Sequence, residues 1–570
     1  MKKLYLLVSL TFLNTLILAQ TATEKLIFDF NSVSKFDLSH QPYRGWLSFI
    51  YDKASGTYVY VKSDTTREGK VKYVLISNKG TSRGYDSFDY GVVFDEYGNY
   101  YSFAFDTVSE NKVNFYLIKN GNNVFQSGKR VIIIGKHNRF IYFTQDENYG
   151  RVLYRYDYSS GKLSHGKAYY MIYGVSFTKD NKPFFLAQSN KGFPAEEKFY
   201  VIDDKEQKHY SDIFWDSPDA SGYPVYLAKK RGRFQSYAGD ENINSGMFLV
   251  YGNKEYRKLE SISRQVIVNE SGIPVYVGRD FKDPENKVRL IIGDNETGNA
   301  YYNISELGLT PEKKIIFIAD INKSTDYYTS DFNQNAKCVV YNGIEGDVYV
   351  SIKNLKVYPK DRFIYIAEKK GGEKVIVTND GEVNIQHPDS SKIDILDAEI
   401  LPDGKILCAY KVKKKINSKW EDKSYIRSGD EVIGPFLGFP AIKVSKFYFQ
   451  TDGNGNYTIM CVKKDNDSAD IKDYIYSNTG ISSEHDGILY INFYNGKVLY
   501  EGAELSGRNY YSWRQRIYYD FKPVSPEYDQ ISPTYVVNSN FKFDESAGIL
   551  TFVGLRDYRF YDVEIKFQNE

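Results

Sequence analysis

Short segments of alternating hydrophobic and polar residues run through most of the chain, separated by turns that contain Gly, Asn or Asp. The stretch FDEYGNYYSFAFD (Phe94 to Asp106) shows the pattern: one strand, a tight turn at Asp95 to Asn99, and a second strand. Side chains on a strand alternate between two faces, and these turn residues supply the positive φ that a tight hairpin requires. Helical periodicity is nearly absent, so the sequence predicts an all-β protein.

The hairpins recur at a regular interval. Their turn residues are Gly56, Gly98, Asn138, Asn181, Gly222, Gly272, Lys323, Asp361, Gly404, Gly455, Gly496 and Gly548. The mean spacing is about 45 residues, which is the length of a four-stranded propeller blade. A second family of strands, such as KYVLISNKG and MFLVYGNKE, lies between these turns. Each unit therefore holds two hairpins, and the pattern predicts a β-propeller built from twelve four-stranded repeats.

Propellers usually have four to eight blades, so twelve units favour two six-bladed propellers in tandem. We predict the boundary in ISELGLTPEKK, where the interval between turns lengthens, which gives propellers over residues 46–307 and 308–570. One ring of twelve blades, or an uneven division, stays open as an alternative. Residues 20–45 form an N-terminal segment, whose stretch Glu24 to Leu38 is expected to supply a closing strand that pairs with VEIKF near the C-terminus.

Composition adds two expectations. The chain has 570 residues, of which 53 are Tyr and 36 are Phe, and a blade can bury its faces only against neighbouring blades. The aromatic side chains are therefore expected to form the packing layer between blades, with an apolar body and a polar tip. Lys plus Arg number 74 and Asp plus Glu 73, a net charge of +1. No global field exists to hold nucleic acid or an anionic membrane surface.

The N-terminus has the pattern of a secretory signal peptide over residues 1–19. Lys2 and Lys3 precede an apolar run from Leu4 to Leu18, and the small residue Ala19 follows. A retained membrane anchor is the alternative, but the run is shorter than the ~20 apolar residues that span a bilayer. We expect an exported protein with no membrane span after cleavage. The sequence does not decide between the periplasm and the extracellular space.

Several repeats resemble a known family. LPDGKILCAY places Asp403, Gly404 and Lys405, followed by Tyr410 one position late, as in the F-S-P-D-G-K-x-x-x-Y phrase of the bacterial exported TolB-type propeller repeats, which are related to WD-repeat propellers. QTDGNGNYTIMC keeps only the Asp-Gly pair, and units such as FTKDNKPFF depart from the phrase. The resemblance implies a propeller and a periplasmic protein-binding role. It carries over no catalytic residue.

No sequence motif indicates a catalytic, cofactor or metal site. The six histidines show no metal-ligand spacing, and neither H-E-x-x-H nor G-x-S-x-G occurs. TDGNGN (Thr451 to Asn456) has the alternate oxygen-bearing residues of a calcium loop but lacks its final Glu, so a hairpin turn explains it better. The three cysteines, Cys338, Cys408 and Cys461, lie in apolar strands and are expected to be packed and free; a Cys408–Cys461 bridge is the alternative.

Two insertions are the candidate contact sites. Ala228 to Gly246 carries Phe234 and Tyr237 beside basic residues, and Val412 to Lys423 carries Trp420 in the same setting. Loops on a rigid scaffold are where recognition tends to reside. The sequence therefore predicts a non-catalytic scaffold for a protein or cell-envelope partner, with no cofactor. The alternative is a carbohydrate-binding or carbohydrate-active propeller, since a pair of catalytic acids can be neither found nor excluded among so many acidic residues.

Overall fold

The computed structural model describes residues 22–29, 49–110, 112–147, 150–189, 197–219, 222–230, 246–281, 283–322, 336–388, 393–416, 419–435, 441–442, 449–452, 455–464, 471–505, 513–532, 541–557 and 559–567. These residues form fifty strands in twelve antiparallel sheets, and no helix occurs among them. The predicted all-β class and the twelve four-stranded repeats are confirmed. We number the sheets as blades 1 to 12 in chain order.

Blades 1 to 4 comprise β2 (Phe49–Asp52), β3 (Thr57–Thr65), β4 (Val71–Ser77), β5 (Gly80–Thr81); β6 (Ser87–Phe94), β7 (Tyr100–Ser109), β8 (Lys112–Lys119), β9 (Asn122–Ser127); β10 (Val131–His137), β11 (Phe140–Glu147), β12 (Gly150–Asp157), β13 (Lys162–Tyr169); and β14 (Met171–Phe177), β15 (Pro183–Gln188), β16 (Lys198–Ile202), β17 (Lys205–Glu206).

Blades 5 to 8 comprise β18 (Asp212–Pro218), β19 (Pro224–Lys229), β20 (Met247–Tyr251), β21 (Lys254–Glu255); β22 (Ser261–Val268), β23 (Pro274–Arg279), β24 (Val288–Ile292), β25 (Asn295–Tyr301); β26 (Asn303–Leu309), β27 (Ile315–Asp320), β28 (Lys337–Tyr341), β29 (Ile344–Glu345); and β30 (Ser351–Tyr358), β31 (Arg362–Glu368), β32 (Lys374–Thr378), β33 (Gly381–Val383).

Blades 9 to 12 comprise β34 (Ile393–Ile400), β35 (Ile406–Ile416), β36 (Lys419–Ser428), β37 (Glu431–Ile433); β38 (Ala441–Ile442), β39 (Phe449–Thr451), β40 (Tyr457–Lys464), β41 (Ile471–Ser477), β42 (Gly480–Ile481); β43 (Gly487–Tyr494), β44 (Lys497–Leu505), β45 (Trp513–Tyr519), β46 (Lys522–Pro523); and β47 (Gln530–Ile531), β48 (Lys542–Asp544), β49 (Ile549–Arg556), β50 (Arg559–Lys566), together with β1 (Ala22–Asp29).

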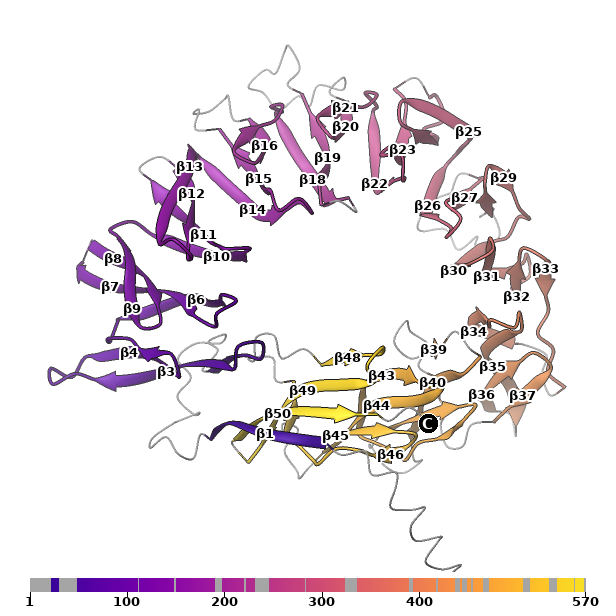
Figure 1. Cartoon of the computed structure of the whole chain (residues 1–570). Helices are drawn as coiled ribbons and strands as arrows, with labels where there is room; N and C mark the ends of the chain where they lie inside the picture. Colours follow the sequence, from indigo (N-terminus) through magenta and orange to yellow (C-terminus); the bar gives the residue numbers. More distant parts are fainter. Residues whose placement is uncertain are drawn as a thin grey trace, which may run out of the picture.

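The blades follow one another around a single opening, with the first strand of each blade innermost (Figure 1). Hydrophobic residues gather in twelve clusters, and each cluster joins one blade to the next. Both faces of every sheet are thus covered by neighbouring sheets, which is the burial that an isolated blade lacks. The predicted aromatic packing layer is confirmed, because most of these clusters contain buried Tyr or Phe.

The ring is closed by the N-terminal strand. β1 pairs antiparallel with β50, so that Ala22 lies opposite Ile565 and Asp29 opposite Arg559. Phe28 then packs between the last blade and the first, 5.0 Å from the ring of Tyr58 and 5.2 Å from that of Tyr60. The predicted closing strand is confirmed. It makes the two ends of the chain part of one sheet.

The predicted division into two six-bladed propellers does not match this arrangement. The boundary between residues 307 and 308 falls inside β26, and one hydrophobic cluster contains Val275 of blade 6 and Phe317 of blade 7. The difference arises at the turn of the seventh hairpin. TPEKK is the turn between β26 and β27, where Lys313 has φ 67°, so the seventh hairpin turns at Lys313 and not at Lys323, which lies outside the described residues. The other eleven predicted turn residues all have positive φ.

The cysteines are free and buried, as predicted. Cys408 faces blade 8 and Cys461 faces blade 9, because each belongs to a different inter-blade cluster. The alternative bridge between them is therefore absent. Burial raises the pKa of the Cys408 thiol to about 12, so it stays protonated and behaves as a small hydrophobic residue.

In five blades a tyrosine two residues before the first strand donates its hydroxyl to the outermost strand of that blade. These contacts end on a carboxylate or an amide: Tyr85 to Asn123, Tyr210 to Glu255 (3.0 Å), Tyr301 to Glu345 (2.7 Å), Tyr349 to Glu382 (2.9 Å) and Tyr528 to Glu24 (2.6 Å). We call this contact the tyrosine clamp. It gives each buried phenol a hydrogen-bond acceptor, which a buried hydroxyl needs.

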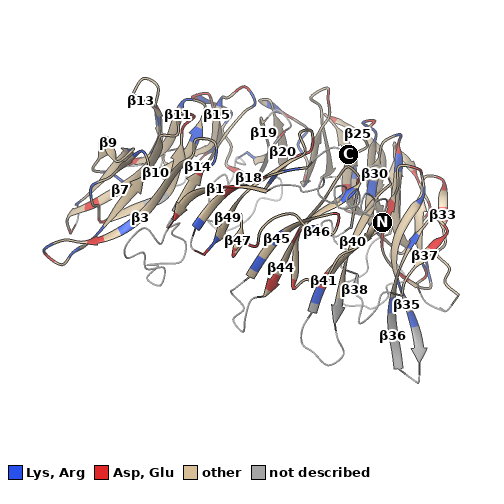
Figure 2. Ribbon diagram, turned by 60° about the horizontal axis from the view of Figure 1, so that its bottom comes forward, with Lys and Arg blue, Asp and Glu red and all other residues tan. Residues whose placement is uncertain are grey.

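Long connections join the second strand to the third in several blades. The first and second strands are joined by short turns, whereas residues 189–197, 230–246 and 321–336 join the second strand to the third. Because every blade has the same strand order, the second strands all end on the same side of the ring. The β40–β41 and β44–β45 pairs point to one common side in Figure 2. We call this side the loop face.

Candidate functional site

The two predicted contact segments each connect a second strand to a third, β19 to β20 and β35 to β36. Phe234 and Tyr237 lie outside the described residues. The segment Val412 to Lys423 was expected to be a loop, but it extends β35 and β36 into a longer hairpin in which Lys415 lies opposite Trp420. The side chain of Trp420 is outside the described residues.

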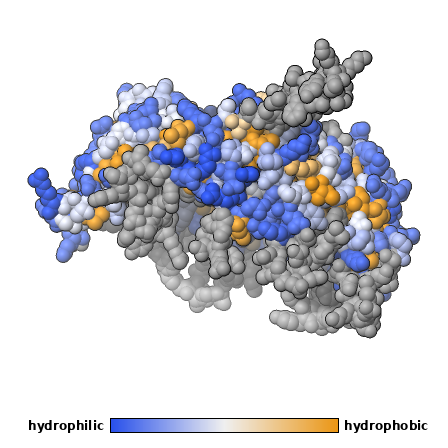
Figure 3. Space-filling view, turned by 90° about the horizontal axis from the view of Figure 1, so that it is seen from below, coloured by the Kyte–Doolittle hydropathy of each residue, from blue (hydrophilic) through white to orange (hydrophobic). Residues whose placement is uncertain are grey.

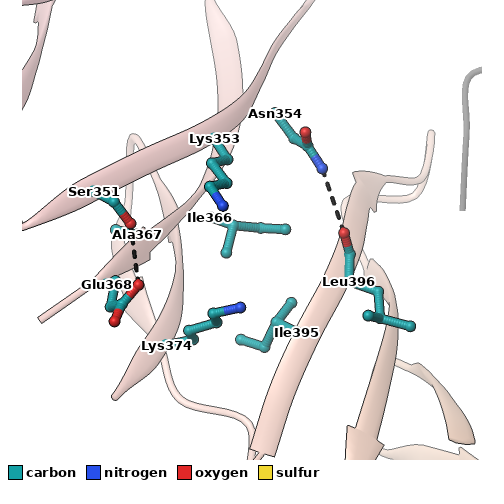
Figure 4. A pocket seen from close by; sticks show the side chains of 9 residues that line it. All are labelled: Ser351, Lys353, Asn354, Ile366, Ala367, Glu368, Lys374, Ile395 and Leu396. Atoms are coloured by element: carbon teal, nitrogen blue, oxygen red, sulfur yellow. Dashed lines mark hydrogen bonds between the residues drawn. The ribbon is translucent and has the colours of Figure 1, made fainter. Parts of the chain in front are cut away.

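A pocket lies on the same side of the ring, between blades 8 and 9 (Figure 4). One side of the pocket is formed by the start of β30, the end of β31 and the start of β32. These strand ends lie side by side, because Ser351 pairs with Glu368 and Glu368 pairs with Lys374. Its volume is about 40 Å³, which is room for a carboxylate-sized group or a few waters. Nine residues line it: Ser351, Lys353, Asn354, Ile366, Ala367, Glu368, Lys374, Ile395 and Leu396.

The pocket exists because the innermost strand is irregular there. The pairing of β30 with β31 shifts between Lys353 and Lys356, and Asn354 has φ 55°. A bulge of this kind leaves its residues unpaired and re-aims their side chains. The amide of Asn354 donates to the carbonyl oxygen of Leu396 (3.4 Å) in the next blade. Similar irregularities occur in β14 and β26, so the bulge is a feature of the repeat.

The pocket is lined by charged side chains of both signs. Lys353 and Lys374 both point their ammonium groups into it (Figure 4). Lys374 forms an ion pair with Asp394, and Glu368 accepts a hydrogen bond from Ser351 Oγ (3.2 Å). Lys353 is exposed and makes no ion pair with any residue that the structure describes. One ammonium group is thus available to a ligand, above an apolar floor made by Ile366 and Ile395.

A polar network joins β30 to β34 beside the pocket. Lys356 Nζ lies 2.7 Å from Asp397 Oδ1 and 2.7 Å from Glu399 Oε1. Tyr358 donates to Glu399 as well. Burial, followed by the charge of Glu399 and that hydrogen bond, raises the pKa of the Tyr358 hydroxyl well above its ordinary value. These contacts fix β30 against β34 and leave Lys353 as the accessible cation.

Charges of both signs are spread over the ring. Basic and acidic residues are scattered along the strands in Figure 2, and the face seen in Figure 3 is mainly hydrophilic with separate hydrophobic patches. Within the described ranges, no group of three or more His, Cys, Asp and Glu side chains could hold a metal ion. In the described part of TDGNGN, Asp452 caps a hairpin turn by accepting the N–H of Asn456 (3.0 Å). No helix that could span a membrane occurs in the part of the chain that the structure describes.

Comparisons with known proteins find similar solved structures but no family. No protein-family model matches the chain, and no curated protein matches it. Similar solved structures include a eukaryotic initiation factor, at 10% identity over 69% of this chain and 97% of that one, with a TM-score of 0.31. TolB from Acinetobacter baumannii matches at 12% identity over 55% of this chain and 87% of that chain, with a TM-score of 0.18.

A further match is the β-propeller domain of the Trilobed protease from Pyrococcus furiosus, at 12% identity over 63% of this chain and 96% of that domain, with a TM-score of 0.23. TolB and propeller domains are therefore among the structural neighbours, and the structure itself shows the β-propeller. At TM-scores below 0.5, these likenesses support no conclusion about activity, partners or origin.

Proposed function

We propose that this chain is an exported β-propeller that serves as a binding scaffold for a protein or cell-envelope partner, and that it binds with the loop face. The observation that carries the proposal is the gathering of features on that face: the long connections between second and third strands, the β35–β36 hairpin and the pocket with Lys353. The rest of the ring is held by inter-blade cores and supplies the rigidity on which recognition loops depend.

The pocket indicates which group of the partner it receives. An ammonium group over an apolar floor, with an amide at the rim, suits a carboxylate, because hydrogen bonds to an ionised group are the stronger kind. An acidic side chain or a C-terminal carboxylate of a protein partner fits this description. Lys353 is the lysine of the pocket that has no ion-pair partner among the described residues, so recognition there would depend mainly on Lys353.

A capture experiment from the native cell envelope tests the proposal. The wild-type chain serves as bait beside Lys353→Glu, Trp420→Ala and Phe234→Ala/Tyr237→Ala, with Lys405→Glu as the matched control. Lys405 belongs to a turn between first and second strands and therefore lies on the opposite face. We expect the wild type and the Lys405→Glu control to recover the same protein, and the loop-face variants to recover it less.

The proposal is wrong if no specific component is captured, or if every variant captures it equally. Recovery of a polysaccharide instead of a protein would favour the carbohydrate-binding alternative.

A further inference from the structure

Ser483, His485 and Glu504 form a hydrogen-bonded relay in blade 11. Ser483 Oγ lies 3.1 Å from His485 Nε2, and His485 Nδ1 lies 2.8 Å from Glu504 Oε1. The imidazole is only 1% exposed, whereas Ser483 is exposed. A hydroxyl at the surface is thus connected through a buried histidine to a carboxylate. The order of groups and the distances are those of a nucleophile, its base and the group that orients the base.

The carboxylate fixes the tautomer of the imidazole. Glu504 can only accept, so His485 Nδ1 carries the proton and Nε2 presents its lone pair. That lone pair faces the hydroxyl of Ser483, with the hydroxyl of Tyr500 more distant at 3.4 Å. The imidazole ring packs against Tyr518 as well, with 4.9 Å between ring centroids. The base is held in place and shielded from water.

The repeat shows that packing alone does not require this arrangement. Tyr85 in blade 2 and Leu259 in blade 6 occupy the position of His485, as the equivalent bridges between blades show. Two residues before each of them lies an arginine, and it pairs with the acid equivalent to Glu504: Arg83 with Asp106 (2.7 Å) and Arg257 with Asp280. In blade 11 the hydroxyl of Ser483 stands in place of the guanidinium, and His485 stands in place of Tyr85 or Leu259. Glu504 therefore orients an imidazole, and Lys472 Nζ lies 3.7 Å from its other oxygen.

We infer that Ser483 is an activated nucleophile that accepts the acyl group of a carboxylic ester reaching the loop face. Ser483 Oγ attacks the carbonyl carbon while its proton passes to His485 Nε2, and the tetrahedral intermediate expels the alcohol, which takes that proton from Nε2. Water then attacks the acyl-serine by the same relay and releases the acid. General base catalysis of this kind is worth about 10²- to 10⁴-fold. The inference is independent of the scaffold proposal and departs from the expectation of a non-catalytic chain.

The test uses the full mature chain with two probes, a biotinylated fluorophosphonate and p-nitrophenyl acetate. Attack of Ser483 on phosphorus forms an O–P bond and releases fluoride, so mass spectrometry locates the label. We expect the label on Ser483, its loss in Ser483→Ala, and slower labelling in Glu504→Gln by about tenfold or more. Partial recovery in Glu504→Asp distinguishes orientation of His485 from a merely structural role.

Ser546 is the internal control. It is exposed and donates its hydroxyl proton to Asp544 (2.7 Å), with no imidazole at hand. We expect no label on Ser546 and unchanged ester turnover in Ser546→Ala. The inference is overturned if the folded protein labels Ser483 no faster than Ser546, or if Ser483→Ala hydrolyses the ester at the wild-type rate. Far-ultraviolet circular dichroism confirms that each variant is folded.

Discussion

The tyrosine clamp can be tested at Tyr210, by its change to phenylalanine. The Tyr210 ring is 1% exposed, and its hydroxyl donates to Glu255 Oε1 at 3.0 Å. Phenylalanine keeps the ring and its packing but removes the donor. A hydrogen bond to a charged group contributes about 1.5–3 kcal/mol to stability. Glu255 keeps two cationic neighbours, Lys230 at 2.6 Å and Lys208 at 3.5 Å, so we expect a loss near the lower end of that range.

Tyr410 supplies the matched control. It is fully buried in another inter-blade cluster, and its hydroxyl has no hydrogen-bond partner among the described residues. Its change to phenylalanine removes an unsatisfied polar group, which should be neutral or stabilising. Burial raises the pKa of the Tyr210 hydroxyl and raises that of the Tyr410 hydroxyl to about 12, so both wild-type phenols are un-ionised at pH 7.

The assay is urea unfolding at pH 7, followed by far-ultraviolet circular dichroism, with hydrogen exchange to report on β21. We expect Tyr210→Phe to lower the free energy of unfolding by about 1–2 kcal/mol and to speed exchange near Glu255. Tyr410→Phe should do neither. Equal effects of the two changes would refute the view that the clamp, and not the ring alone, stabilises the blade.

Three further predictions concern acid, a buried carboxyl and the closing strand. Burial alone would raise the pKa of Glu255, but hydrogen bonds from Lys230 and Tyr210 lower it, and hydrogen bonds from Asn299 and Tyr301 lower the pKa of Glu345. The two ionised carboxylates therefore stabilise the fold above the ordinary pKa of 4.5, and this contribution is lost as the pH falls below it. Urea unfolding at pH 7 and pH 3.5 should show the loss. Burial raises the pKa of Glu501 to about 8, so ionisation of this carboxyl destabilises the wild type as the pH rises from 4.5 to 8. The variant Glu501→Gln lacks this loss, so its free energy of unfolding should exceed that of the wild type by a margin that grows with pH, up to about a few kcal/mol. A margin that does not change with pH would contradict this. Phe28→Ala should cost about 3–5 kcal/mol and speed hydrogen exchange in β50 while leaving β23 protected; equal effects on both strands would argue against a local role in closure.

The sequence was sufficient for the repeat because the repeat is local. A strand, a turn residue with positive φ and a second strand are set by neighbouring residues, and Gly98 or Asn181 shows this directly at the turn. Even the distant pairing of β1 with β50 followed from a rule, since a ring needs a strand to close it. The number of rings depended on a single turn at Lys313, where a lysine adopts a conformation that usually marks Gly or Asn.

The sites were beyond the sequence because they join residues from different strands or blades. Lys353 and Lys374 meet at the pocket only after a bulge in β30, and a bulge leaves no clear signal in a strand pattern. Ser483 and His485 are two residues apart, so an S-x-H search could have found them, but Glu504 joins them only through the pairing of β43 with β44. The predicted aromatic contacts, Phe234, Tyr237 and Trp420, stay predictions.

The central claim is that twelve blades form one ring sealed by β1, and a designed disulfide tests it most directly. In the structure Thr23 of β1 lies opposite Glu564 of β50. The pair Thr23→Cys/Glu564→Cys should therefore form a disulfide on mild oxidation, seen as a linked peptide by mass spectrometry, while Thr23→Cys/Thr297→Cys, which reaches for β25 of blade 6, should not. A link from Thr23→Cys to blade 6 with none to β50 would mean that the first six blades close on themselves, and would contradict the single ring.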